Sequence, residues 1–399
     1  MKPVSQDAVR GLMIAAQGLD DQPQPPATKG AVLDVIRRLH MLQIDSINVV
    51  ARAPYFVLWS RLGDYDPQWL DELLEEAALF EHYAQANCFL PIEDYVYHHA
   101  GSRIFDWRDP RTWLDENPEV AEFVLNHVRK YGETRHTDFK RVDGQKSGWE
   151  NPKEEQTALD YFVYVGEMMI RKRDNFQRVY DLRERIFPGA DKLTPVSRAE
   201  AHDQFVLKTI RALGVTKGEW IPHYFRLKHM DVIAAIKRLD KKGALLRVEV
   251  EGWDKPGYID PDNLKMVEAT IDGDIPQSKT TFLSPFDPLV WDRDRANVVF
   301  NFDFPIEFYF PEAKRVYGYY SLPILYKNAL IGRLDPKLHR QEGIFEVKSL
   351  HIEPGVVLDD DLVFAVQTTI KACADWHKAT QIIIRDTTES GIADIFRID

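Results

Sequence analysis

Residues 31–48, AVLDVIRRLHMLQIDSIN, combine two periodicities that decide how this part of the chain folds. Apolar residues recur at helical spacing across Ala31–His40, which predicts an amphipathic helix. The following residues alternate between apolar and polar side chains, as an extended segment does, with Gln43 and Asp45 as the polar pair. Because side chains two positions apart share one face of an extended chain, we expect Gln43 and Asp45 to lie side by side.

An amide beside a carboxylate can hold one water molecule, because the carboxylate accepts its proton and the amide fixes its orientation. Asp45 and Ser46 are also typical helix N-cap residues, so a helix is expected to begin just after them. Such a helix end would help to keep Asp45 ionised. The alternative is that both residues only cap that helix, and the three-residue motif taken alone favours this alternative.

The composition indicates a multidomain enzyme or binding protein of a reducing compartment. A chain of 399 residues suggests about two to four domains, and it has neither an apolar run of membrane-spanning length nor a signal peptide. Its two cysteines, Cys88 and Cys373, exclude a disulfide framework and a cysteine-rich zinc site. The adjacent His98 and His99 would diverge on a helix, so we expect no metal and no cofactor. A cytoplasmic location, close to the nucleoid, is expected.

The formal net charge of −12 disfavours a nucleic-acid partner when it is taken as a total. The charge is spread unevenly, since residues 63–81 carry seven acidic side chains and no Lys or Arg. Residues 205–247 instead carry ten Lys and Arg residues against three acidic ones. A local basic face is sufficient for phosphate contacts, although an ordinary solvated helix face explains this stretch equally well.

Helical segments followed by strand pairs recur along the chain and predict an α+β fold. We expect tandem winged-helix units at 1–131, 132–190 and 191–265, followed by a C-terminal β-barrel-like domain at 266–399. Within this scheme Lys153–Arg173 is predicted to be one helix, and the polar residues 132–152 to mark a boundary. Strands are predicted from Lys279 onward, including residues 298–310, VVFNFDFPIEFYF, and a last helix is predicted to follow Asp359.

Four blocks in order resemble the AlkZ/YcaQ (AlkX) family of bacterial DNA glycosylases. The first is residues 42–63, LQIDSINVVARAPYFVLWSRLG, and the others are residues 148–188, 282–295 and 317–340. The Gln-apolar-Asp form of the motif is similar to that of the YcaQ (AlkX) branch. The resemblance implies winged-helix units and a β-barrel around a concave DNA-binding face. It also implies Gln43 and Asp45 as catalytic residues.

The resemblance further implies a monofunctional glycosylase that removes N7-alkylated guanine from double-stranded DNA and unhooks interstrand crosslinks. We expect a monomer, without membrane association. Phosphate contacts are predicted for a set of basic residues near the motif and at the end of one basic helix: Arg52, Arg61, Arg173, Lys237, Arg238, Lys241 and Lys242. A non-catalytic winged-helix regulator is the main alternative, and an unrelated hydrolase is a third possibility that no motif supports.

Overall fold

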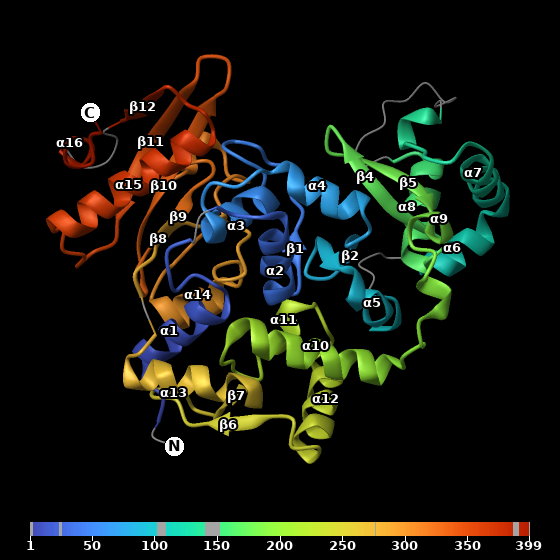
Figure 1. Cartoon of the computed structure of the whole chain (residues 1–399), viewed down its shortest axis with the longest axis horizontal. Coiled ribbons are helices and arrows are strands. Elements are labelled where there is room, and N and C mark those ends of the chain that lie inside the picture. The colour runs from blue at the N-terminus through green and yellow to red at the C-terminus, as the bar shows by residue number, and fades with distance from the viewer. Residues whose placement is uncertain are drawn as a thin grey trace.

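The computed structural model describes residues 3–23, 26–101, 109–139, 152–275, 277–385 and 391–398. The core of the predicted boundary near Gly144 and Trp149 lies outside these residues. Within them, no helix combines the length and the apolar composition needed to span a membrane. The fold mixes helices with small, mostly antiparallel sheets, as predicted (Figure 1).

The first winged-helix unit surrounds the Gln43–Asp45 segment. Its elements are α2 (Lys29–Leu39), β1 (Leu42–Gln43), α3 (Ala53–Leu62), α4 (Gln68–Glu75), β2 (Leu79–Tyr83) and β3 (Asn87–Pro91). The short strand β1 pairs with β3, which pairs with β2, so the sheet order is β1-β3-β2. Helix α2 ends where His40 adopts a left-handed conformation, with φ of 59°, and this turn directs the chain into β1.

The second unit repeats this order of three helices and a wing. Its elements are α6 (Pro110–Glu116), α7 (Pro118–Tyr131), α8 (Glu154–Val165), β4 (Met168–Asp174) and β5 (Gln177–Leu182). A single bridge between Thr134 and Tyr180 takes the place of β1. The prediction of a helix to Arg173 was wrong, because Gly166 adopts φ of 83° and ends α8, after which the chain forms the hairpin β4–β5.

The third unit has the same pattern. It contains α10 (Arg198–Leu213), α11 (Ile221–Tyr224), α12 (His229–Lys241), β6 (Leu246–Val248) and β7 (Gly257–Ile259), with a Thr216–Tyr258 bridge. Helix α10 begins with a capping box, in which Ser197 and Glu200 satisfy each other's backbone amides. The connecting helices are α5 (Tyr95–Gly101), α9 (Arg183–Ile186) and α13 (Leu264–Asp272). Helix α1 (Gln6–Ala16) packs against α10 and α13 rather than against α2.

The C-terminal part is a curled five-stranded sheet in the order β12-β11-β10-β9-β8. Its strands are β8 (Thr280–Phe282), β9 (Leu322–Tyr326), β10 (Ala329–His339), β11 (Ile344–Ile352) and β12 (Gln381–Ile384). Helix α15 (Asp360–Trp376) is capped by Asp359 as predicted, whereas α16 (Ile392–Ile395) is a short final helix. The strand predicted over residues 298–310 was wrong, because residues 293–300 form the helix α14 (Arg293–Phe300), capped by Asp292, and residues 301–310 form no strand.

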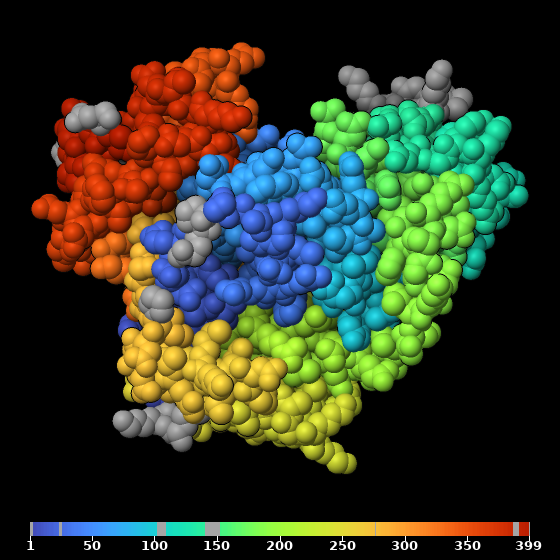
Figure 2. Space-filling view, in the orientation of Figure 1, coloured from blue at the N-terminus to red at the C-terminus, as the bar shows by residue number. Residues whose placement is uncertain are grey.

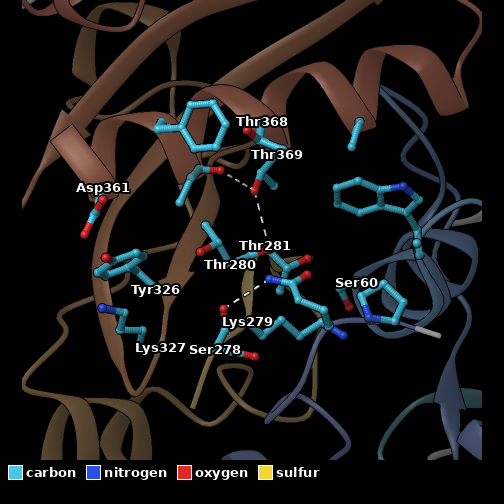
Figure 3. Close-up of a pocket in the computed structure, with 17 residues that line it drawn as sticks. Ser60, Ser278, Lys279, Thr280, Thr281, Tyr326, Lys327, Asp361, Thr368 and Thr369 are labelled. Carbon is cyan, nitrogen blue, oxygen red and sulfur yellow. Dashed lines mark hydrogen bonds between the residues drawn. The ribbon is translucent and has the colours of Figure 1, made fainter. Parts of the chain in front are cut away.

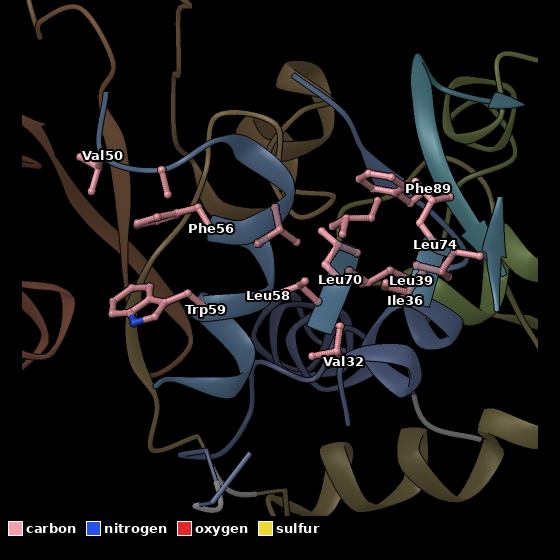
Figure 4. Packing of buried hydrophobic residues seen from close by; sticks show 14 of the residues in the cluster. Val32, Ile36, Leu39, Val50, Phe56, Leu58, Trp59, Leu70, Leu74 and Phe89 are labelled. Carbon is pink, nitrogen blue, oxygen red and sulfur yellow. The ribbon is translucent and has the colours of Figure 1, made fainter. Parts of the chain in front are cut away.

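The buried core of the first unit is continuous with the C-terminal sheet. Phe56 and Trp59 on α3 project toward the C-terminal sheet, whereas Ile36 and Leu70 pack between α2 and α4 (Figure 4). Trp59 stacks on Trp376 of α15 with ring centroids 6.0 Å apart. Burial of such aromatic surface contributes a few kcal/mol per side chain, roughly 25 cal/mol per Å² of apolar area. The motif-bearing unit is therefore fixed rigidly against the C-terminal sheet.

The units are arranged around the first one, which occupies the centre of the molecule (Figure 1). The C-terminal sheet lies on one side, the second unit lies on the other, and the third lies below. Figure 2 shows that the upper edge of this view is hollowed between the C-terminal part and the second unit. The loop from β1 to α3 lies at the base of this notch, with the β10–β11 and β4–β5 hairpins rising on either side.

Candidate functional site

Gln43 is the last residue of β1, and its position is fixed by the sheet. It pairs with Cys88 on β3, and the next residue, Ile44, donates its backbone N–H to the carbonyl oxygen of Asn87 at 2.8 Å. The extended segment that the alternating pattern predicted is therefore held in the sheet as far as Ile44, and Asp45 follows it. The Gln43 Oε1 atom is buried and accepts no hydrogen bond from any described residue. A buried amide oxygen of this kind usually binds water or a ligand, because leaving it unsatisfied costs about 1–3 kcal/mol.

Asp45 does not cap a helix, so the N-cap prediction was wrong. Its Oδ1 atom accepts the backbone N–H of Ile47 at 2.8 Å and closes a local turn, while the next helix begins only at Ala53. Burial raises the pKa of the Asp45 carboxyl group above its ordinary value, and the Ile47 hydrogen bond opposes that rise. The predicted support from a helix N-terminus is absent from these contacts. A half-buried carboxylate with a raised pKa is a stronger base than an exposed one.

Tyr320 is a second polar side chain close to Asp45. Its backbone N–H donates to Asp335 at 2.8 Å, and its ring is buried. Burial raises the pKa of the Tyr320 phenol well above its usual range; the nearby Ser284 hydroxyl lowers it and the charge of Asp45 raises it further. The phenol is therefore neutral at pH 7 and keeps its proton. The charge of Asp45 therefore acts on a neutral phenol that the C-terminal part contributes.

The motif loop, defined here as residues 44–52, is held by both neighbouring hairpins. At the β10–β11 turn, Arg340 donates Nη2 to Asn48 Oδ1 at 2.8 Å and to the Val50 carbonyl oxygen at 2.6 Å. At the β4–β5 turn, Phe176 lies under the Arg52 guanidinium, 4.2 Å from the ring centroid. The loop has no regular secondary structure, so these contacts with distant segments determine its conformation.

The prediction that Arg61 contacts phosphate was wrong. Its side chain is only 1% exposed and forms a bidentate ion pair with Asp287, at 2.5 and 3.0 Å. The guanidinium also donates to the carbonyl oxygen of Gln17 at 3.1 Å. A buried pair of this kind joins α3 to the C-terminal segment and cannot reach DNA.

Arg173 lies close to the motif loop but is already occupied. Its guanidinium binds Glu81 with a 2.8 Å contact from Nη2 to Oε2, and it stacks on Phe176 at 4.6 Å. Its side chain is only 8% exposed, so Arg173 links the second unit to the first rather than presenting a charge to solvent. Arg52 is half-buried and makes no ion pair among the described residues. A phosphate contact stays a prediction for Arg52 and is disfavoured for Arg173.

Some of the basic residues predicted at the end of α12 form ion pairs within the protein, and the others are exposed. Arg238 and Lys242 both bind the buried carboxylate of Asp203, at 2.7 and 3.4 Å, so they pin α12 to α10. Lys237 and Lys241 are exposed, and neither makes an ion pair within the described parts of the chain. Two of the four predicted phosphate contacts therefore stay available, because the others serve packing.

A cavity of about 450 Å³ lies between α3, β8 and α15, away from the motif loop (Figure 3). Its wall includes Lys279, whose ammonium group donates to the Arg61 carbonyl oxygen at 2.9 Å. Burial and the neighbouring Arg61 charge lower the pKa of Lys279 to about 7. No residue of the motif loop lines this cavity, so it does not belong to the Gln43–Asp45 site.

The sequence of the chain matches the profile of a known family across most of its length. The DNA glycosylase AlkZ-like family matches residues 36–376, which include the motif and all four blocks. The chain belongs to this AlkZ-like DNA glycosylase family. Among solved structures, Streptomyces sahachiroi DNA glycosylase AlkZ is similar, with 16% sequence identity and a TM-score of 0.64. The match covers 96% of this chain and 99% of that one, so the two folds agree over their whole length.

Membership of the AlkZ-like family identifies DNA as the macromolecule on which the chain acts. The winged-helix units and the curled C-terminal sheet are those of this fold. No group of three or more metal-ligating side chains occurs among the described residues. The assignment to the YcaQ (AlkX) branch rests only on the Gln-apolar-Asp motif.

Reasoning from the sequence missed the partners that the C-terminal sheet contributes to this AlkZ-like site. Tyr320 and Arg340 both lie in the quoted block 317–340, but nothing local marked them as neighbours of Asp45. Lys337 and Lys348 were missed as well, although they line a cleft that begins at Asn48. No lysine lies near the Gln43–Asp45 motif in the sequence, but Lys337 and Lys348 lie near the motif loop in the folded protein.

Proposed function

We propose that the chain is a monofunctional DNA glycosylase that hydrolyses the N-glycosidic bond of N7-alkylated guanine, including guanine in interstrand crosslinks. The observation that carries this proposal is the half-buried Asp45 carboxylate two positions after Gln43, whose buried amide oxygen accepts no hydrogen bond, in a chain of the AlkZ-like family. Gln43 and Asp45 are the proposed catalytic residues. No cofactor is required.

The chemistry of the substrate explains why one carboxylate is sufficient. An N7-alkylated guanine carries a positive charge, so its glycosidic bond is weakened and the leaving base needs little protonation. Most glycosidases use two carboxylates, one of which protonates the leaving group. In this enzyme Asp45 stabilises the oxocarbenium-like sugar and accepts the proton of the attacking water. Gln43 orients that water through its amide.

The shape of the molecule supports a bulky lesion. A crosslinked base cannot be rotated freely into a snug pocket, which is how most glycosylases read their target. The motif loop instead lies between two hairpins (Figure 1), where the upper edge of the molecule is hollowed (Figure 2). Such an open site accommodates a base that is still joined to the opposite strand.

The test is an excision assay on a duplex with a single 7-methylguanine, followed by alkaline cleavage of the abasic sites. The proposal predicts strand cleavage that depends on the protein and on alkali. Wild-type protein that binds the duplex without producing abasic sites would instead identify a non-catalytic winged-helix regulator. A nitrogen-mustard crosslinked duplex, run on a denaturing gel, separately tests unhooking.

A further inference from the structure

A cleft of about 440 Å³ opens beside the motif loop, at the base of the β10–β11 hairpin. The motif loop contributes Asn48 and Val49 to its wall, three and four positions after Asp45. Four basic side chains also line it, those of Arg315, Lys337, Arg340 and Lys348, together with Glu312 and Asp335. We call this feature the basic cleft.

The side chain of Lys348 enters the basic cleft because of an irregularity in the sheet. Asp335 pairs with Ser349, but Pro336 pairs with Val347, so Lys348 is the extra residue of a β-bulge. A bulge changes the direction of one side chain without altering the rest of the ladder. The result is that Lys348 lines the same cleft as Lys337, which lies on the neighbouring strand.

Two of the three carboxylates near these cations, those of Asp335 and Glu346, are already engaged. Asp335 accepts the backbone N–H groups of Tyr319 and Tyr320, at 3.0 and 2.8 Å, and burial raises the pKa of its carboxyl group. Glu346 lies opposite Lys337 on β11, but it binds His339 at 2.7 Å and also Arg385. Glu312 lines the cleft and is exposed to solvent. Within the described parts of the chain, Lys337, Lys348 and Arg340 make no ion pair.

Arg340 connects this charge to the motif loop. Its Nη2 atom donates hydrogen bonds to Asn48 and Val50. Burial lowers the pKa of Arg340, and the nearby charge of Arg52 lowers it further. Two like charges held near each other repel, and a bound anion between or beside them would remove that repulsion. A phosphate group is the anion that DNA supplies at regular spacing.

We propose that the basic cleft binds a backbone phosphate of the DNA beside the damaged nucleotide, and that Arg340 transmits this contact to the motif loop. This proposal rests on the proposed function, since it assumes a DNA substrate at Gln43 and Asp45. Lys337 and Lys348 supply the electrostatic contact. Arg340 acts as a positioning residue, because it holds Asn48 and Val50 while the phosphate binds next to it.

The first experiment measures the salt dependence of binding. The double variant Lys337→Ala/Lys348→Ala is compared with wild type on an unmodified duplex and on a duplex with one 7-methylguanine. The double variant loses one phosphate contact, which is expected to reduce the slope of log K against log salt by about 1. The matched control Lys265→Ala/Lys371→Ala removes two exposed lysines from α13 and α15 and should keep the wild-type slope.

A neutral methylphosphonate, placed at one backbone position at a time around the lesion, locates the contact. At the position bound by the cleft it should weaken wild-type binding and leave the double variant unaffected. An unchanged slope in the double variant, or equal effects on both proteins at every position, overturns the phosphate site. The unmodified duplex keeps this result separate from the proposed function, because binding there does not require excision.

The second experiment isolates the positioning role of Arg340. Arg340→Lys keeps the positive charge, but the lysine side chain is shorter and does not place a donor where Nη2 meets both Asn48 Oδ1 and the Val50 carbonyl oxygen. Its affinity for DNA should stay within about twofold of wild type, while the single-turnover rate at saturating protein falls on the order of tenfold to a hundredfold. Equal losses of affinity and rate, or an unchanged rate in a variant with the wild-type Tm, would refute the positioning role.

Discussion

Replacement of Asp45 by asparagine is the sharpest test of the catalytic assignment. Asparagine has the same shape and retains an oxygen that can accept the Ile47 N–H, which now lies 2.8 Å from Asp45 Oδ1. The local turn should therefore persist. Only the negative charge and the base are lost. Electrostatic stabilisation of a transition state by one group is typically worth about 3–4 kcal/mol, so the excision rate should fall on the order of a hundredfold to a thousandfold.

The raised pKa of Asp45 also predicts the direction in which Asp45→Asn changes the stability of the folded protein. Burial raises the folded-state pKa above its ordinary value, so the ionised carboxylate destabilises the folded protein at pH 7. The asparagine side chain carries no charge and removes that cost. The Tm of Asp45→Asn should therefore equal or exceed that of wild type. A catalytic residue is expected to combine lost activity with unchanged or increased stability.

The assay is single-turnover excision of 7-methylguanine, with DNA affinity and Tm measured on the same preparations. Because activity needs the ionised form, the wild-type rate should fall as the pH drops through the raised pKa of Asp45, and residual activity of Asp45→Asn should lack this acid limb. Gln43→Ala should cost less, since it removes only the orientation of water. Asp45→Gln could retain part of the activity if an amide suffices there. An Asp45→Asn protein that is folded and excises at the wild-type rate would refute the assignment.

Three further predictions test other parts of the molecule. Lys237→Glu/Lys241→Glu should weaken binding to all duplexes and flatten the salt slope without changing Tm. Arg238→Glu/Lys242→Glu should also lower Tm, because both side chains hold Asp203. Identical Tm values for the two double variants would contradict this. Borohydride should trap no covalent protein–DNA adduct, although Lys337 and Lys348 lie near the motif loop, and stoichiometric trapping would show a lyase step. Burial lowers the pKa of His82 to about 4 and those of His98 and His99 well below 6.5. The stability present above pH 6.5 should therefore decrease on acidification, by on the order of 1 kcal/mol per histidine at one pH unit below 6.5. Thermal melts at neutral and mildly acidic pH measure this, and a pH-independent Tm would disprove it.

Local signals in the sequence were sufficient for much of the fold. Helix α10 could be predicted because Ser197 caps it and Gly214 follows it, and α15 could be predicted from Asp359. The error at α8 arose because Met169 and Ile170 continue the helical spacing of apolar residues beyond Gly166. The glycine and the pairing of β4 with β5 outweighed that periodicity. Periodicity alone cannot locate such an end, because the decisive strand partner follows later in the chain.

The sequence predicted only those residues of the candidate site that lie close together along the chain. Gln43 and Asp45 lie on one short extended segment, so alternation and chemical type were enough to single them out. Which arginines face DNA could not be deduced, since ion pairing depends on acids far away in sequence: Asp287 neutralises Arg61, and Glu81 neutralises Arg173. Arg340 presents the opposite case, because it is 292 residues from Asn48 and yet holds the loop.

The two hairpins beside the motif loop suggest how the fold couples DNA binding to catalysis. The loop has no secondary structure of its own, and its conformation depends on Arg340 from one hairpin and on the Arg52–Phe176 stack at the other. The β10–β11 hairpin belongs to the C-terminal sheet and the β4–β5 hairpin belongs to the second winged-helix unit. The conformation of the loop therefore depends on the positions of both. DNA bound in the notch would contact both units at once. Under the proposed function, a duplex that fits both hairpins would hold Asp45 in place, and correct docking would then be a condition for hydrolysis.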